Sequence, residues 1–243
     1  MAFNKESNGF TFGFAIALVV VVGAALAILA TSLRGTIAKN GEDKKRLDIL
    51  SAFVDLDKEG INRKNAKAEF DNRVDMDQSL VIDAEGNAIE GKDPFEIDIK
   101  KEYKDKTLDP SKRSFPLFVA EKEGQKVYVI PVVGKGLWGP IWGNVCIAAD
   151  KRTITGASFG HKGETPGLGA EITQKYFING WIDKKISDDS GNPITFKIVK
   201  DGTGKGDAIK VDGISGGTIT SKGVEEMINR CMKPYVKYFS TLN

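Results

Sequence analysis

Residues 115–133 read FPLFVAEKEGQKVYVIPVV, two apolar runs of strand length on either side of a turn around Gly124. β-branched and aromatic residues favour strands, and a glycine between two such runs marks a hairpin turn. The stretch therefore predicts two antiparallel strands. Residues 79–89 follow the same plan, with the turn around Gly86. Two successive hairpins predict a largely antiparallel sheet.

Beyond the second hairpin the chain mixes predicted strands and helices without a strict βαβ repeat. Residues 141–149, 153–159, 194–199 and 208–211 have the composition of strands, and residues 172–181 have the spacing of a helix. This mixture predicts an α+β domain.

The amino-terminal segment from Ser7 to Leu33 contains no charged residue and is long enough to span a bilayer. A cleaved signal peptide has a shorter apolar stretch, of about 7–15 residues. We therefore expect a short tail over residues 1–9 and a single transmembrane helix over 10–33. The positive charges that follow favour a cytoplasmic domain, although a long domain can translocate regardless of charge, so the charges leave its side open.

After the predicted anchor, residues 39–70 alternate charged and apolar positions with helical spacing, which predicts a stalk helix. We expect a membrane-proximal stalk and α/β region over residues 34–114. The main domain is expected over residues 115–243.

The composition excludes several classes of function. Lysine and arginine exceed aspartate and glutamate by only two (35 against 33), and no basic tract with interleaved aromatic residues occurs, so nucleic acid is not expected as a partner. His161 is the only histidine, which argues against a zinc centre or a serine hydrolase triad. Cys146 and Cys231 lack metal-ligand spacing, and whether they pair stays open. Residues 202–206 (GTGKG) resemble a phosphate loop, but Gly206 stands where that loop needs a Ser or Thr to hold magnesium. We predict neither a catalytic residue nor a metal site.

Two glycine-rich tracts are candidates for ligand binding. Residues 161–169 (HKGETPGLG) join a predicted strand to a predicted helix and let bare backbone approach a flat or phosphorylated ligand. Residues 212–218 (DGISGGT) precede a helical pattern for which Thr220 or Ser221 is the expected N-cap. Amides at a helix start attract phosphate, so a phosphate ester on Thr218 would be favoured there. Both tracts are also compatible with ordinary tight turns.

Three segments resemble one family. Residues 212–218 resemble the Asp-Gly-x-Ser/Thr-Gly-Ala/Ser-Thr signal of the bacterial flavin transferase, with Gly217 as a departure that preserves small size. Residues 164–169 are similar to the flavin-contacting loop of FMN-binding domains. Residues 134–143 resemble a segment of the C subunits of sodium-translocating NADH:quinone reductases. The resemblance implies FMN joined by a phosphoester to Thr218, with Asp212 as a determinant for the transferase. The implied FMN-binding residues are Thr218, Asp212, Ser215, Gly216, Gly217, Glu164, Thr165, Gly167, Leu168, Gly169, Leu137 and Trp138.

The resemblance also implies an electron relay on the periplasmic side of a bacterial inner membrane, and we follow it over the charge pattern. Electrons would pass from a membrane iron–sulfur centre toward the FMN of the B subunit and a quinone, and the chain alone would not oxidise NADH. The implied partners are the A, B, D, E and F subunits of the reductase, the membrane and, during maturation, the flavin transferase. Alternatives are the homologous G subunit of an Rnf-type complex, a noncovalent flavoenzyme and a non-catalytic, membrane-tethered ligand-binding module.

Overall fold

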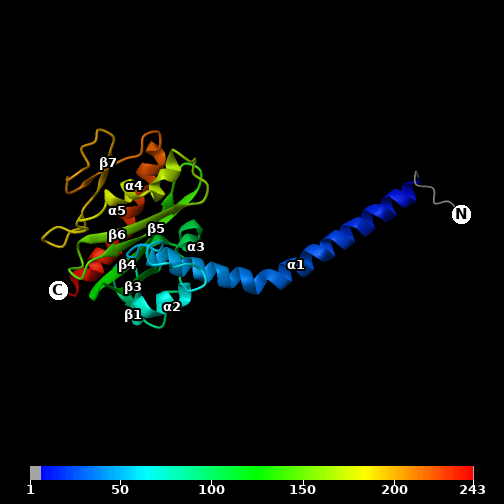
Figure 1. Ribbon diagram of the computed structural model, residues 1–243, viewed down its shortest axis with the longest axis horizontal. Coiled ribbons are helices and arrows are strands. Elements are labelled where there is room, and N and C mark those ends of the chain that lie inside the picture. The colour runs from blue at the N-terminus through cyan, green and yellow to red at the C-terminus, as the bar shows by residue number, and fades with distance from the viewer. Residues whose placement is uncertain (1–6, 243) are drawn as a thin grey trace. The chain divides into compact units, whose positions relative to one another are not determined.

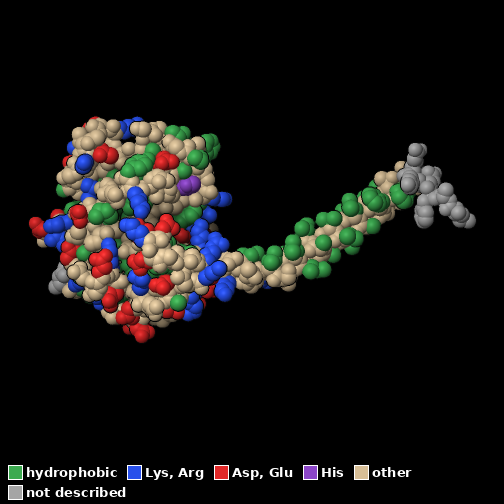
Figure 2. Space-filling view, viewed as in Figure 1, with side chains coloured by type: hydrophobic (Ala, Val, Ile, Leu, Met, Phe, Trp, Pro, Cys, Tyr) green, Lys and Arg blue, Asp and Glu red, His purple; other side chains and the backbone are tan. Residues whose placement is uncertain are grey.

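The computed structural model describes residues 7–242 and separates the chain into two compact units, one ending at Lys44 and one beginning at Lys45. The apolar segment lies in helix α1, Asn8–Leu50, the one helix among the described residues with the length and composition to cross a membrane. The helix is labelled in Figure 1, and its exposed surface carries hydrophobic side chains along most of its length (Figure 2).

The predicted stalk helix of residues 39–70 is wrong beyond Leu50. There the chain leaves the helix in a series of turns, and Phe70 belongs to a separate helix, α2, Ala66–Arg73. The reason lies in the core: Ile49 and Leu50 at the end of α1, and Phe53 in the turn that follows, are buried in the second unit. Turning the chain at this point places Phe53 in the same cluster as Ile49 and Leu50, whereas a continuous helix would carry Phe53 away from it.

The second unit is built on a six-stranded antiparallel sheet with the order β2-β1-β3-β4-β5-β6. The α+β prediction and both predicted hairpins, β1–β2 and β3–β4, are confirmed. The strands are β1 Val74–Ile82, β2 Ala88–Ile89, β3 Phe115–Lys122, β4 Gln125–Lys135, β5 Pro140–Ile147 and β6 Ile154–His161.

Both faces of the sheet are buried, which explains the uninterrupted apolar runs of its central strands. Successive side chains of a strand point to opposite faces. In β3, Leu117 and Val119 join a core cluster with helix α5, Thr218–Ser240, while Phe118 and Ala120 join a second cluster with the end of α1 and with α2. The sheet is therefore a middle layer, with α5 on one face.

The two cysteines lie on opposite faces of this sheet. Cys146 belongs to the cluster with α1 and α2, and Cys231 to the cluster with α5; both are free and buried. The sheet between them prevents a disulfide within one chain.

The remaining elements are short. The helix predicted over residues 172–181 is instead a 3-10 turn, η2 Gly169–Thr173, followed by one turn of helix, α4 Lys175–Asn179. Phe177 and Trp181 from this region pack edge to face on Phe159 of β6, with ring centroids 5.9 and 6.1 Å away, so their spacing reflects packing on the sheet and not a continuous helix. The others are α3 Ile99–Lys104, η1 Pro110–Lys112 and the parallel pair β7 Lys197–Val199 and β8 Lys210–Asp212.

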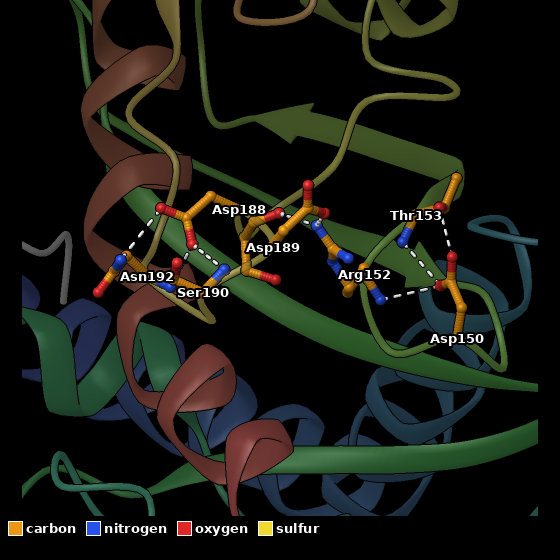
Figure 3. A network of polar contacts seen from close by, with 8 residues as sticks. Asp150, Arg152, Thr153, Asp188, Asp189, Ser190 and Asn192 are labelled. Carbon is orange, nitrogen blue, oxygen red and sulfur yellow. Dashed lines mark hydrogen bonds and ion pairs between the residues drawn. The ribbon is translucent and has the colours of Figure 1, made fainter. Parts of the chain in front are cut away.

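A polar network fastens the turn between β5 and β6 to the hairpin of residues 187–193 (Figure 3). The Asp150 carboxylate accepts hydrogen bonds from the amides of Arg152 and Thr153, and the Arg152 guanidinium lies 2.8 Å from an oxygen of Asp189. Asp188 accepts the amides of Ser190 and Asn192 in its own turn.

Candidate functional site

The 212–218 tract joins the end of β8 to the start of α5. The helix begins at Thr218, and its N-cap is Gly217, which offers no side chain to the first turn. The first backbone hydrogen bond at this end runs from the Ser221 amide to the Gly217 carbonyl (2.9 Å). Within the described residues, the amides of Thr218, Ile219 and Thr220 donate to no backbone carbonyl, so they are available to an anion at this helix start.

The expected N-cap at Thr220 or Ser221 is wrong, because both residues lie inside the helix with their side chains buried. The Ser221 hydroxyl accepts the Ile214 amide at 3.1 Å, and the Thr220 hydroxyl donates to Glu164 at 2.6 Å. Thr218 is half-buried, and its hydroxyl makes no hydrogen bond within residues 7–242. Of these three hydroxyls, that of Thr218 is the one left for chemistry.

Glu164 connects its own loop to the turn between β4 and β5 and to the first turn of α5. Its side chain is only 4% exposed, although it lies in a surface loop. One carboxylate oxygen accepts the amide of Trp138 at 2.8 Å, and the other accepts the Thr220 hydroxyl. The amide of Glu164 itself donates to Nδ1 of His161 at 3.1 Å. The carboxylate therefore points into the protein and ties residues 134–143 to the first turn of α5.

The 164–169 loop packs directly on the 212–218 tract. A Cβ atom on Gly217 would lie 3.1 Å from the carbonyl carbon of Leu168, and one on Gly216 would lie 2.5 Å from its Cδ2. A larger residue at 217 would press on the backbone of Leu168, and one at 216 would displace the Leu168 side chain. Gly169 is buried at the end of the loop, whereas Thr165 and Gly167 are exposed.

Exposed apolar side chains from all three segments lie on the surface. Leu137 and Trp138 come from the turn between β4 and β5, and Trp138 is 70% exposed. Leu168 comes from the loop, and Ile219 from the first turn of α5. Ile219 was not among the residues expected from the sequence, because its exposure depends on Thr220 facing inward to Glu164, which the sequence does not show.

Asp212 and Ser215 lie in different surroundings within the tract. Ser215 is exposed, as is Gly216. Asp212 is half-buried, and its carboxylate accepts the amide of Gly204 at 2.9 Å. It also lines a cavity of about 600 Å³ together with residues of α4 and of the 204–208 loop. The structure thus packs the 164–169 loop against Gly216 and Gly217 and links it to Trp138, whereas Asp212 lies at the far end of the tract on this second cavity.

The same region matches a known family model. Residues 136–233 match the FMN-binding domain family, a span that contains the 164–169 loop, the 212–218 tract and most of residues 134–143.

Among curated proteins, the chain is similar to the C subunit of the Na(+)-translocating NADH-quinone reductase of Pseudomonas aeruginosa, with 30% identity over 93% of this chain and 92% of that protein. The corresponding protein of Yersinia pestis is 28% identical over 94% of this chain and 91% of its own length.

Solved structures agree with these relatives. The crystal structure of the Na(+)-translocating NADH-quinone reductase C subunit from Parabacteroides distasonis is 37% identical, with a TM-score of 0.74, and the match covers 87% of this chain and 98% of that one. The crystal structure of Shewanella oneidensis NqrC is 25% identical in sequence, with a TM-score of 0.66, and the match covers 84% of this chain and 99% of that one. Nearly full-length similarity in both sequence and fold shows that the chain belongs to the family of Na(+)-translocating NADH-quinone reductase C subunits.

Proposed function

We propose that this chain is the FMN-carrying subunit of a Na(+)-translocating NADH-quinone reductase, with FMN joined to Thr218 by a phosphoester. The observation that carries the proposal is the half-exposed Thr218 hydroxyl, free of partners among the described residues, at a helix start with three open amides. A phosphate ester formed there would be stabilised by these amides and by the positive end of the helix dipole.

The surroundings of Thr218 fit a flat aromatic ring. Leu137, Trp138 and Leu168 present exposed apolar surface from two neighbouring segments, and the backbone around Thr165 and Gly167 is open to solvent. These groups would shield one face of the ring while backbone amides contact its polar edge. Ser215, Gly216 and Gly217 would leave room for the phosphate, and buried Glu164 and Gly169 would support the loop from below.

Bound FMN supplies one-electron chemistry, while the chain holds it in place and shapes its surroundings. We propose that the chain relays electrons from a membrane iron–sulfur centre toward the FMN of the B subunit and a quinone, without oxidising NADH by itself. The proposed partners are the A, B, D, E and F subunits of the complex. Support comes from the relatives, which are named as the C subunit of such a reductase.

Helix α1 would anchor the chain in the bacterial inner membrane, with the second unit on the periplasmic side, where we propose that the flavin transferase modifies Thr218. Asp212 would guide that enzyme, since its carboxylate is held by the Gly204 amide beside an open cavity. Reporter proteins fused to the carboxy terminus test on which side of the membrane the second unit lies. If it is periplasmic, an alkaline phosphatase fusion should be active and a green fluorescent protein fusion should not fluoresce. The reverse pattern would contradict the periplasmic placement.

Covalent attachment is tested by co-expression with the flavin transferase, followed by a denaturing gel viewed under ultraviolet light and by peptide mass spectrometry. The band should fluoresce, and the mass of FMN should lie on the peptide that contains Thr218. Thr218→Ala should abolish both signals, and Thr218→Ser should retain part of them because the nucleophilic oxygen remains.

Thr220→Val and Ser221→Ala serve as controls, since both hydroxyls are buried, and both variants should keep the attached FMN. FMN found on Thr220 or Ser221, or a wild-type band without fluorescence, would overturn the assignment. A yellow protein that loses its colour on denaturation would indicate a noncovalent flavoenzyme instead.

A further inference from the structure

We propose that Glu164 is the positioning residue of this site: its buried carboxylate fixes the turn that carries Leu137 and Trp138 relative to the start of α5, and so relative to Thr218. The inference rests on the proposed attachment of FMN at Thr218, and it assigns Glu164 to the support of the site and not to contact with the flavin.

The first argument is the direction of the hydrogen bonds. Both donors to the carboxylate come from outside its own loop, the Trp138 amide at 2.8 Å and the Thr220 hydroxyl at 2.6 Å. Trp138 and Thr220 lie in different segments and are joined here through one side chain. Hydrogen bonds to a charged acceptor are stronger than those between neutral groups, so this link is more than a loop contact.

The second argument is the space around the carboxylate. A Cβ on Gly136 would lie 2.6 Å from one carboxylate oxygen, and a Cβ on Gly169 would lie 2.6 Å from the other and would also collide with the Thr220 hydroxyl. Two glycines thus leave room for this side chain, Gly136 from the turn between β4 and β5 and Gly169 from the end of its own loop. The protein is built around the carboxylate at this point.

The third argument concerns charge. Among residues 7–242 Glu164 forms no ion pair, so its buried carboxylate depends on the hydrogen bonds from Trp138 and Thr220. Burying such a group is costly unless it is fully hydrogen-bonded. The donors must therefore stay in position, and this requirement holds Trp138 and the first turn of α5 at a constant separation before any flavin is attached.

The experiment uses the full chain in detergent micelles, first with Thr218→Ala so that no flavin is bound. Amide hydrogen exchange at Trp138 is measured by NMR or by mass spectrometry of short peptides. Glu164→Ala should accelerate exchange at Trp138 by about tenfold or more, as loss of a charged acceptor predicts. Thr220→Val should also accelerate it when Glu164 is present, and should have no further effect in the Glu164→Ala background, because the coupling passes through the carboxylate.

The second measurement uses the flavin-loaded chain with Thr218 intact and reads the visible circular dichroism of the attached flavin. Glu164→Ala and Thr220→Val should diminish this signal. Glu164→Gln should keep the circular dichroism of the wild type, because the glutamine oxygen can accept the Trp138 amide while the glutamine NH2 group donates to the Thr220 oxygen. Thr173→Val is the matched control, since Thr173 is exposed and its hydroxyl bonds only the nearby Ala170 carbonyl. It should change neither measurement.

The proposal would be overturned if Glu164→Ala left the exchange rate at Trp138 unchanged. It would also be overturned if Thr220→Val accelerated this exchange further in the Glu164→Ala background. A flavin signal that is identical in Glu164→Ala and wild type would overturn it as well. If no FMN attaches to Thr218 in the wild type, the proposed function fails, while the exchange measurement still decides the role of Glu164. Glu164→Gln and Thr220→Val preserve side-chain volume and keep the test valid if Glu164→Ala does not fold.

Discussion

Gly216 is constrained both by its backbone conformation and by its contact with the Leu168 side chain. Its φ of 72° lies in the left-handed region, and a Cβ there would lie 2.5 Å from Cδ2 of Leu168. The second contact is with the end of a flexible side chain, which can rotate away. The conformational constraint therefore acts on stability, whereas the contact acts on the position of Leu168 over the site.

A comparison of two alanine variants separates these effects. Gly202 has nearly the same φ, 73°, but nothing lies within 4 Å of a Cβ placed there. Gly216→Ala and Gly202→Ala should each lower the free energy of unfolding by about 1–2 kcal/mol, the cost of a left-handed conformation for a residue other than glycine. Urea denaturation measures this. Only Gly216→Ala should change the visible circular dichroism of the attached flavin, and an equal change in Gly202→Ala would contradict the assignment of Leu168.

The cysteines provide a second prediction at this scale. Burial raises the pKa of both the Cys146 and the Cys231 thiol, so the reactive thiolate is scarce as well as inaccessible. N-ethylmaleimide should leave the folded protein unlabelled and add to both residues in urea without a reductant, as read by intact mass. Failure to label in urea unless a reductant is present would show a disulfide and contradict their placement on opposite faces.

Helix α5 is held along its whole length, and a buried hydroxyl near its end illustrates how. The Tyr235 side chain is fully buried, and its hydroxyl donates to the Pro116 carbonyl of β3 at 2.9 Å. Tyr235→Phe should lower the free energy of unfolding by about 1 kcal/mol, the net contribution of one such bond. Tyr238→Phe is the control, since its half-buried hydroxyl has no hydrogen-bond partner within the described chain. Equal losses in the two variants would show that the bond to Pro116 is not the cause.

The hairpin of residues 187–193 should respond to acid. The Asn192 amide and, next, the Asn192 side chain lower the pKa of the Asp188 carboxyl below its ordinary value of about 3.9. A lowered pKa in the folded state contributes stability above the unfolded pKa and loses it as the pH falls through the folded value. The melting temperature should therefore fall below about pH 4, less steeply in Asp188→Asn. If the melting temperature falls equally steeply below about pH 4 in the wild type and in Asp188→Asn, Asp188 makes no such contribution.

The elements that could be predicted from the sequence are those set by local pattern. The hairpins around Gly86 and Gly124 were predictable because each has a turn glycine between two strand-like runs. The N-cap of α5 and the helix over residues 172–181 were not, since both depend on contacts distant in sequence. Thr220 looks like a capping residue until its partner, Glu164, 56 positions away, is known. The same contact shows that Glu164 points inward, which its place in an exposed loop motif could not reveal.

At the scale of the whole molecule, the compact second unit begins inside α1. The last turns of this helix belong to the domain: Ile49 and Leu50 are 2% and 0% exposed, and the Lys45 ammonium donates to the carbonyls of Phe95 and Ile97. The Asp48 carbonyl also accepts a hydrogen bond from Asn144 of β5 at 2.8 Å. The segment that begins as a candidate membrane anchor thus ends as part of the domain core.

Two truncated chains test this division. A chain that begins at Arg34 keeps the whole buried end of α1 and should unfold at the same urea concentration as the full-length protein. A chain that begins at Ser51 loses Ile49 and Leu50, each worth about 1.5–3 kcal/mol of burial, together with the hydrogen bonds of Lys45 and Asp48. It should therefore be less stable by several kcal/mol, a large part of the roughly 5–15 kcal/mol typical of a folded domain. Equal unfolding midpoints for the two truncated chains would mean that the domain begins after α1 and that the last turns of the helix serve only as a linker to the membrane.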